Sequence, residues 1–175
     1  TFRDPENVKQ VVLHPYLLKQ YNNRWYLLGA AEDGYILNFA LDRIDDVDLM
    51  PSVKYMESDE GLEERFYDIV GVTLPQDAQV EKILLWVSET QYPYIETKPL
   101  HGSQRAIRGS RAEQLHKEYG FSDGHFIEIR CIVNTELKQL IASFIDQVVV
   151  LTPTSLRNEM AERVEALLKR YNSRI

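Results

Sequence analysis

The chain has 175 residues, of which 44% are hydrophobic, and its formal charge at neutral pH is −7. This length is sufficient for one good core or two small ones. The acidity excludes binding to duplex nucleic acid through bulk charge, because that mode needs a basic face that displaces counterions from many phosphates. All of the net charge lies in residues 1–75, which hold 7 Lys and Arg against 14 Asp and Glu, whereas residues 76–175 hold 13 of each.

The cysteine, histidine and hydropathy patterns argue against a disulfide-stabilised, zinc-binding or membrane-spanning protein. Cys131 is the only cysteine, so there is no internal disulfide framework, and the four histidines lack zinc-ligand spacing. Cys131 lies in an apolar run and is expected to be a packed core thiol. No apolar run approaches the roughly 20 residues that span a bilayer, and no signal-peptide pattern opens the chain, so we expect a cytoplasmic protein without a membrane partner. The start at Thr1 suggests a segment of a longer polypeptide that lacks its N-terminal part.

Three short strands are predicted in the acidic part of the chain, at residues 8–21, 24–30 and 35–41. Asn22-Asn23 between the first two predicts a two-residue hairpin turn, because Asn tolerates positive φ. Residues 31–34 predict a second tight turn, since they end on Asp and Gly. Antiparallel strands joined in this way suggest a small β-barrel or curled sheet, which hides strand edges.

A turn with a further strand is predicted at residues 42–51, and a short helix at residues 58–69. Residues 71–79 form a plausible boundary because Pro75 and Asp77 break regular structure and the charge balance changes there. The prediction is therefore two domains, residues 1–74 and residues 75–175.

The second domain begins with a strand at residues 80–88 and one or two helical turns in residues 89–98. The glycine-rich residues 102–124 are expected to hold a strand or hairpin arm around Ala106-Ile107 and a helical piece at residues 112–119.

A strand at residues 125–133 is followed by a helix that Asn134 caps and that runs to about residue 144. After a buried strand at residues 148–151, Thr152-Pro153 starts the last helix, in which apolar residues recur at helical spacing: Leu156, Met160, Val164, Leu167 and Tyr171. This order is β-α-β-β-α-β plus a final helix, which predicts a split βαβ sandwich with helices on one face of an antiparallel sheet.

The chain resembles the WYL-domain transcription regulators, which are named for the tripeptide that stands here as Trp25-Tyr26-Leu27. The likeness includes His14-Pro15-Tyr16 and the run at residues 39–44, Phe-Ala-Leu-Asp-Arg-Ile. Residues 83–105 and 127–171 look like the C-terminal extension that commonly follows this domain. Nearly the whole chain is therefore covered by the resemblance.

The resemblance implies a ligand-sensing domain with an Sm-like, SH3-type barrel, usually placed after a winged helix-turn-helix that binds DNA. Relatives use a basic, aromatic groove for a nucleic-acid-derived ligand, such as single-stranded DNA or RNA, an oligonucleotide or a cyclic dinucleotide. This sequence departs from the pattern at Ala40, where many relatives carry an additional arginine. The expected fold class is α+β, a small Sm-like/SH3-type β-barrel followed by a split βαβ (ferredoxin-like) sandwich with a C-terminal helix.

Five residues are candidates for the ligand groove, namely His14, Tyr16, Arg24, Tyr26 and Arg43. If Trp25, the natural centre of a small barrel, enters the core, then Arg24 and Tyr26 point into a groove or into solvent. Arginine offers a planar fork of donors that matches phosphate oxygens, and tyrosine offers a stacking face. The structural alternatives are a surface arginine paired with one of the many nearby acids and a histidine satisfied within the fold.

A second basic set lies in the glycine-rich stretch and comprises His101, Gln104, Arg105, Arg108 and Arg111. These side chains either close over an anion or partner subunit, or belong to a solvated loop.

The leading function is thus a regulatory module that binds a phosphate-bearing ligand and signals to an attached DNA-binding domain. Duplex DNA would be bound only through that missing domain, and a homodimer would suit a palindromic operator. The alternative is a structural dimerisation module without a small ligand. Catalysis is not expected, because no nucleophile-base set, glycine-rich phosphate loop or metal motif stands out, and no cofactor or metal is expected either.

Overall fold

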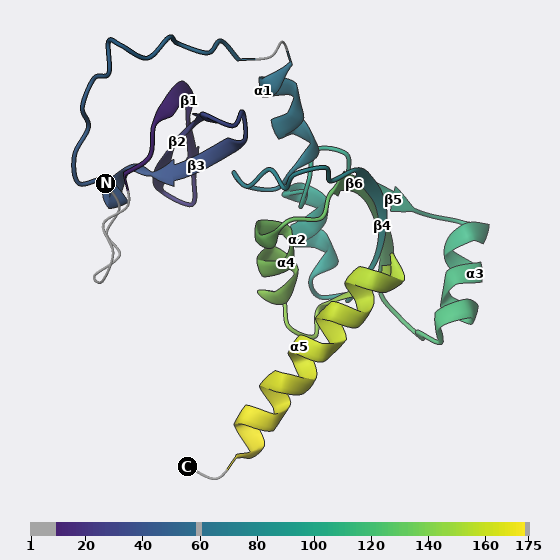
Figure 1. The fold of residues 1–175 in the computed structure, drawn as a ribbon. Helices are drawn as coiled ribbons and strands as arrows, with labels where there is room; N and C mark the ends of the chain where they lie inside the picture. The colour runs from purple at the N-terminus through teal and green to yellow at the C-terminus, as the bar shows by residue number, and fades with distance from the viewer. Residues whose placement is uncertain (1–9, 59–60, 174–175) are drawn as a thin grey trace. The chain divides into compact units, whose positions relative to one another are not determined.

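A computed structural model describes residues 10–58 and 61–173 of the chain. Residues 8 and 9 of the first predicted strand, and Thr1 itself, lie outside the described residues. The chain divides into two units, each of which is described by itself below (Figure 1). The first comprises Thr1–Tyr67 and Gly71–Asp77, and the second comprises Asp68–Val70 and Ala78–Ile175.

The first unit is built on an antiparallel sheet with the order β1-β2-β3, formed by β1 (Leu13–Tyr21), β2 (Arg24–Ala31) and β3 (Ile36–Ala40). Asn22 and Asn23 have φ angles of 47° and 59°, as a tight turn between right-twisted strands requires. The second turn is closed by the amide of Gly34, which donates to the Ala31 carbonyl over 2.9 Å. The three predicted strands and both predicted turns are confirmed, except that the first strand begins only at Leu13 and residues 10–12 precede it.

The described part of this sheet does not close into a barrel. The strand expected at residues 42–51 is wrong, since a short 3₁₀ helix, η1 (Leu41–Arg43), follows β3 and residues 45–58 contain no regular strand. Three aspartates within four residues and Pro51 are poor strand formers. Val47 and Leu49 are accordingly 74% and 91% exposed instead of packing into a sheet.

The buried face of the first sheet differs from the predicted one. Leu28 and Ala30 are fully buried, whereas Trp25, expected in the core, is 49% exposed. Asn38, which pairs with Leu28, donates from Nδ2 to the Val72 carbonyl over 3.0 Å, so the chain after the sheet returns over this face. The helix predicted at residues 58–69 is shorter than expected and consists of α1 (Leu62–Arg65) and the 3₁₀ turn η2 (Phe66–Asp68).

The second unit contains four strands and four helices in the described residues: β4 (Val80–Val87), α2 (Tyr92–Thr97), β5 (Arg105–Ile107), α3 (Ser110–Tyr119), β6 (His125–Ile132), α4 (Thr135–Ala142), β7 (Val148–Thr152) and α5 (Thr154–Asn172). The sheet order is β5-β6-β4-β7 and every adjacent pair is antiparallel. This is the strand order of a βαββαβ unit, here with α3 added between β5 and β6.

Both faces of the second sheet are buried, whereas helices were expected on one face only. On one face, Trp86 and Phe126 pack with Leu115 of α3. On the other face, Ile83 and Ile129 are fully buried. They stand an odd number of positions from Trp86 and Phe126 along their strands and therefore project from the opposite side of the sheet. Figure 1 shows α2 and α4 on one side of this sheet and α3 on the other.

Cys131 is fully buried in β6, which confirms the predicted core thiol. Burial, together with the nearby carboxylates of Asp68 and Glu81, raises the pKa of Cys131 to about 12. The thiol therefore stays protonated in the folded chain at neutral pH, and a protonated thiol is a poor nucleophile.

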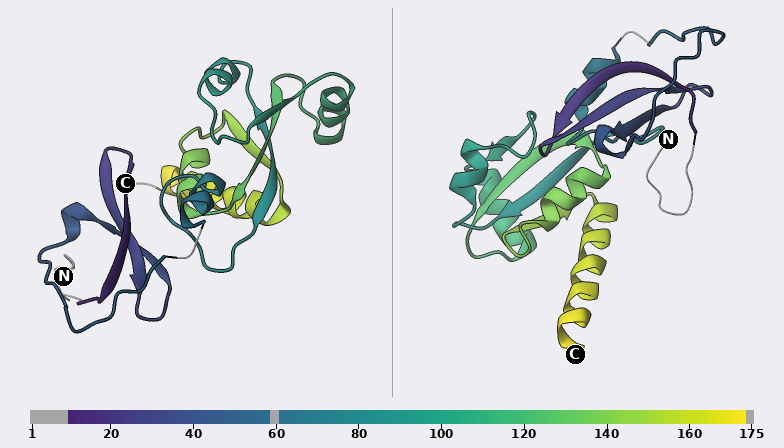
Figure 2. Two further views of the ribbon diagram at one scale, coloured as in Figure 1. Left: turned by 90° about the horizontal axis from the view of Figure 1, so that it is seen from above. Right: turned by 90° about the vertical axis from the view of Figure 1, so that its left-hand side faces the viewer.

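The last helix packs only through its beginning. Leu156 is 2% exposed, and the Glu159 carboxylate contacts Nζ of Lys138 on α4 at 2.6 Å. Every described residue after Met160 is exposed, and α5 extends away from its sheet in the right-hand view of Figure 2. The predicted start is shifted by one position, because Thr152 ends β7 and Pro153 precedes the first helical residue. In the described residues, no helix is long and apolar enough to cross a bilayer.

Candidate functional site

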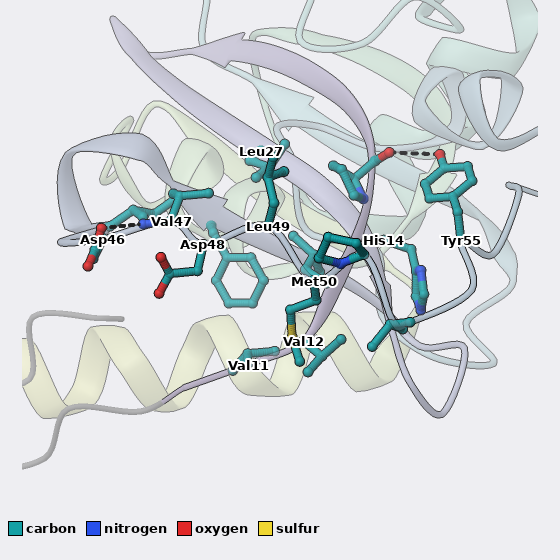
Figure 3. A pocket seen from close by; sticks show the side chains of 16 residues that line it. Val11, Val12, His14, Leu27, Asp46, Val47, Asp48, Leu49, Met50 and Tyr55 are labelled. Atoms are coloured by element: carbon teal, nitrogen blue, oxygen red, sulfur yellow. Dashed lines mark hydrogen bonds between the residues drawn. The ribbon is translucent and has the colours of Figure 1, made fainter.

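The first unit carries two hollows of opposite character. We call one the arginine groove; its cavity volume is about 550 Å³ and its lining is Val11, Arg24, Tyr26, Leu37, Asn38, Phe39, Ala40 and Arg43. We call the other the apolar pocket; its volume is about 520 Å³ and it is lined by residues 11–15, by Leu27, Phe39 and Ile44, and by most of residues 46–55 (Figure 3).

The arginine groove brings together three of the five predicted ligand residues. Arg24 and Tyr26 are two positions apart on β2, so they project from the same face of the strand. Tyr26 pairs with Ala40 at the end of β3, and η1 then carries Arg43 back towards the same hollow. Two guanidinium groups and a half-buried phenol ring therefore converge, which suits a ligand with an anionic group and a flat ring.

The two arginines of the groove differ in their partners. Nε of Arg24 lies 3.2 Å from Oδ1 of Asp42, and both side chains are about half exposed. The sequence had left open whether an aspartate pairs with a groove arginine, and the pair forms at Arg24. Arg43 makes no ion pair within residues 10–58 and 61–173. An anion entering the groove would therefore find the Arg43 guanidinium available. The Arg24 guanidinium would have to leave Asp42 before it could bind the anion.

His14 and Tyr16, the other two predicted ligand residues, do not line the arginine groove. His14 is 6% exposed, and its Nδ1 accepts a hydrogen bond from the Met56 amide over 3.1 Å. The Tyr16 hydroxyl donates to the Glu57 carbonyl over 3.3 Å. The structure thus shows the histidine satisfied within the fold, which was the alternative to a ligand role, and both side chains hold residues 56–57 against β1.

Tyr55 is the residue that sequence reasoning missed in this region. Its ring contacts the His14 ring edge to face, with centroids 5.9 Å apart, and its hydroxyl donates to the Pro15 carbonyl over 2.9 Å. This hydrogen bond joins residues 40 positions apart, and Tyr55 lies in a stretch with no regular secondary structure. No local pattern in the sequence could therefore have identified Tyr55.

The apolar pocket has an uneven distribution of charge along its lining. Figure 3 shows Asp46 and Asp48 at one end and His14 and Tyr55 at the other, with Leu27 between them. Among residues 10–58 and 61–173, no lysine or arginine lines this pocket. This pocket is unsuited to a phosphate-bearing ligand, because its charged side chains are carboxylates.

The second predicted basic set does not form a cradle for an anion. The Arg108 guanidinium lies 3.1 Å from the Glu96 carboxylate. The Tyr92 side chain, and to a smaller extent Glu96, raises the pKa of Arg108 above its ordinary value. Arg105, in β5, and Arg111, at the start of α3, are exposed. The set is therefore spread over the segment before β5, β5 itself, the connection to α3 and the start of α3.

His101 and Gln104 of the same set have local partners. Nδ1 of His101 lies 2.7 Å from Oγ of Ser103, and the Gln104 amide donates to the Ile95 carbonyl over 2.9 Å. Across the described parts of the chain, no group of histidine, cysteine and carboxylate side chains is arranged to hold a metal ion.

Comparisons with known proteins agree with this two-unit organisation. The WCX domain family matches residues 79–168, and the WYL domain family matches residues 1–49. No curated protein matches the chain. Among solved structures, the chain is similar to proteasome accessory factor B/C (PafBC) of Arthrobacter aurescens, with a TM-score of 0.42 and 15% sequence identity over 93% of this chain. The chain spans 23% of the length of that protein.

Proposed function

Because the chain belongs to the WCX-domain family and carries a WYL domain ahead of its WCX domain, we propose that it is the ligand-sensing regulatory region of a DNA-binding transcription regulator. Its ligand is a phosphate-bearing nucleic-acid-type molecule, such as a short single-stranded DNA or RNA or a cyclic dinucleotide. Duplex DNA is bound by a separate domain of the regulator, and the protein acts in the cytoplasm without enzymatic activity.

The convergence of Arg24, Tyr26 and Arg43 in one groove is the observation that supports this ligand class. Guanidinium groups bind phosphate oxygens through paired hydrogen bonds, and a tyrosine ring stacks on a base. The region around the groove is otherwise acidic, so the anion must be captured locally and not by bulk charge. Ala40 lines the groove where many relatives carry another arginine, which leaves these two guanidinium groups to hold the phosphate.

Removal of both groove arginines should abolish most of the ligand affinity. We expect Arg24→Ala with Arg43→Ala to weaken binding of a labelled single strand or cyclic dinucleotide at least about tenfold, and to reduce the slope of log K against log salt by roughly 1.4 for a single strand. Asp42→Asn should tighten binding, because it releases Arg24. The measurement is fluorescence anisotropy at two salt concentrations.

The matched control for this experiment is Arg105→Ala with Arg111→Ala, which removes the same charge from exposed positions of the second unit. Equal weakening by both double variants would show an effect of net charge alone, and unchanged affinity in the groove variant would reject the groove as the site.

A structural dimerisation module is the second candidate, and the exposed end of α5 favours it. Val164, Leu167, Leu168 and Tyr171 are between 42% and 80% exposed and follow the i, i+3, i+4, i+7 spacing of one helix face. Four apolar side chains at this spacing are typical of a helix that packs against a partner helix or groove.

If this face joins two chains, Leu167→Ser with Leu168→Ser should convert a dimer to a monomer in light scattering, because it removes apolar area at the centre of the contact. Ala166→Ser, on the opposite face of the helix, should leave the mass unchanged. A monomer in the unmodified chain, or a dimer that survives the double substitution, would exclude α5 as the contact.

A further inference from the structure

We infer that the apolar pocket of the first unit is a second ligand site, and that it takes a small amphipathic organic cation with an apolar body and a protonated amine. Its volume of about 520 Å³ falls within the range of roughly 300–1,000 Å³ that is usual for small-molecule sites. Val11 and Phe39 line both hollows, but the charged side chains of the apolar pocket are carboxylates and those of the arginine groove are guanidinium groups. This inference does not rest on the function proposed for the arginine groove.

The body of the ligand would lie along an apolar wall formed by three separate segments. Val12 and Leu13 come from the point where β1 begins, Leu27 from β2 and Phe39 from β3, and Met50 from the irregular segment after η1. Figure 3 shows Val12, Leu27 and Met50 around this hollow. Burial of apolar ligand surface against such a wall is favourable in proportion to the area removed from water. A ligand that is charged along its whole length would lose hydration there without compensation.

The cationic group would lie at the end of the pocket that Asp46 and Asp48 occupy. Oδ1 of Asp46 accepts a hydrogen bond from the Val47 amide over 2.9 Å, which leaves its second oxygen for a ligand. Within the described residues, the Asp48 carboxylate has no hydrogen-bond or ion-pair partner. Two carboxylates at one end of a pocket whose described lining holds no lysine or arginine attract a cation and repel an anion.

The opposite end of the pocket is closed by groups that are already satisfied. The Tyr55 hydroxyl donates to Pro15, and Nδ1 of His14 accepts from Met56. Hydrogen-bonding capacity is therefore concentrated at the carboxylate end, which fixes the orientation of an elongated ligand with its charged group at Asp46 and Asp48.

The segment beside the carboxylates carries apolar side chains that a ligand would cover. Leu49 is 91% exposed and Val47 is 74% exposed, although both border the pocket. Such exposure of large apolar side chains around a concave site marks a binding surface. Contact with the apolar body of a ligand would remove part of this surface from water.

Three probes of matched shape separate charge from hydrophobicity: phenylbutylamine, phenylbutanol and phenylbutanoate. We expect two-dimensional NMR titration of the full chain to show the amine binding about tenfold more tightly than the alcohol and the carboxylate binding least, with shifts at residues 11–15 and 46–55. Asp46→Asn with Asp48→Asn should make the affinities for amine and alcohol equal. Glu32→Gln with Glu63→Gln, at exposed positions outside the pocket lining, changes the net charge equally and should leave the preference intact.

Leu49→Ser provides a test that is independent of charge. Because Leu49 is 91% exposed in the ligand-free chain, its substitution should not lower the melting temperature, yet it should weaken binding of amine and alcohol alike. The inference is overturned if no probe binds, if the carboxylate binds as well as the amine, or if the Glu32/Glu63 variant loses the preference equally. Amine binding that persists in the Arg24→Ala, Arg43→Ala variant would support this site even if nucleotide binding in the arginine groove fails.

Discussion

Gly29→Ala is expected to destabilise the first unit by about 3 kcal/mol. A Cβ atom at this position would overlap the backbone carbonyl oxygen of His14 and approach the carbonyl carbon at 3.0 Å. These are backbone atoms of the neighbouring strand, so β1 itself would have to move away from β2. The displacement would also open the wall of the apolar pocket, because residues 11–15 line it.

The measurement for Gly29→Ala is urea denaturation followed by NMR, since the two tryptophan indole signals report separately on the two units. Trp25 belongs to β2 of the first unit and Trp86 to β4 of the second. Gly102→Ala is the matched control, because no atom lies within 4 Å of the added Cβ and its φ is not in the left-handed region. A Gly29 variant as stable as the Gly102 variant would contradict the close strand contact.

Asn134→Ala is expected to cost about 3 kcal/mol in the second unit, as the sum of a lost helix cap and an unsatisfied buried carbonyl. Oδ1 of Asn134 accepts from the Leu137 amide over 2.9 Å and so caps α4. Nδ2 donates to the Val70 carbonyl over 2.7 Å, in a site where Asn134 is only 2% exposed. One side chain therefore satisfies the start of a helix and a distant segment of the chain.

Asn134→Ser separates the two contributions, because serine is a good N-cap but is too short to replace the amide that reaches Val70. We expect the serine variant to lose about 2 kcal/mol or less, with the Trp86 indole as the reporter of unfolding. Equal destabilisation by serine and alanine would show that the cap contributes nothing, and no destabilisation by either would contradict the buried bridge.

Much of the secondary structure was predictable, because its determinants are local. The hairpin turn was predictable because asparagine tolerates positive φ, which Asn22 and Asn23 both adopt. The start of α4 was predictable because the side chain of Asn134 can accept a hydrogen bond from the first turn of a helix. The strands at residues 80–88 and 125–133 were likewise predicted from the sequence, and they correspond to β4 and β6. The prediction failed at residues 42–51, where apolar residues stand among aspartates, because spacing alone does not supply a neighbouring strand.

The same reason explains which of the predicted site residues lie together. Arg24 and Tyr26 share a groove because a strand places alternate residues on one face, which is a local rule. His14 and Tyr16 were assigned to that groove, but their hydrogen bonds go to Met56 and Glu57, more than 40 positions away. Which face of β2 is buried was also predicted wrongly, as the exposure of Trp25 shows.

The sequence by itself determined the family, the order of strands and helices outside residues 42–51, the two turns of the first sheet, and the concentration of acidity in the first part of the chain. These follow from motifs, from periodicity and from composition, none of which depends on contacts between distant residues. Only the tertiary structure decided that Arg24 pairs with Asp42 while Arg43 remains unpaired within the described residues, and that Asp46 and Asp48 border an apolar pocket. The reason is physical: a side chain's partner and its exposure depend on which segments return to cover it, and that is a property of the folded chain.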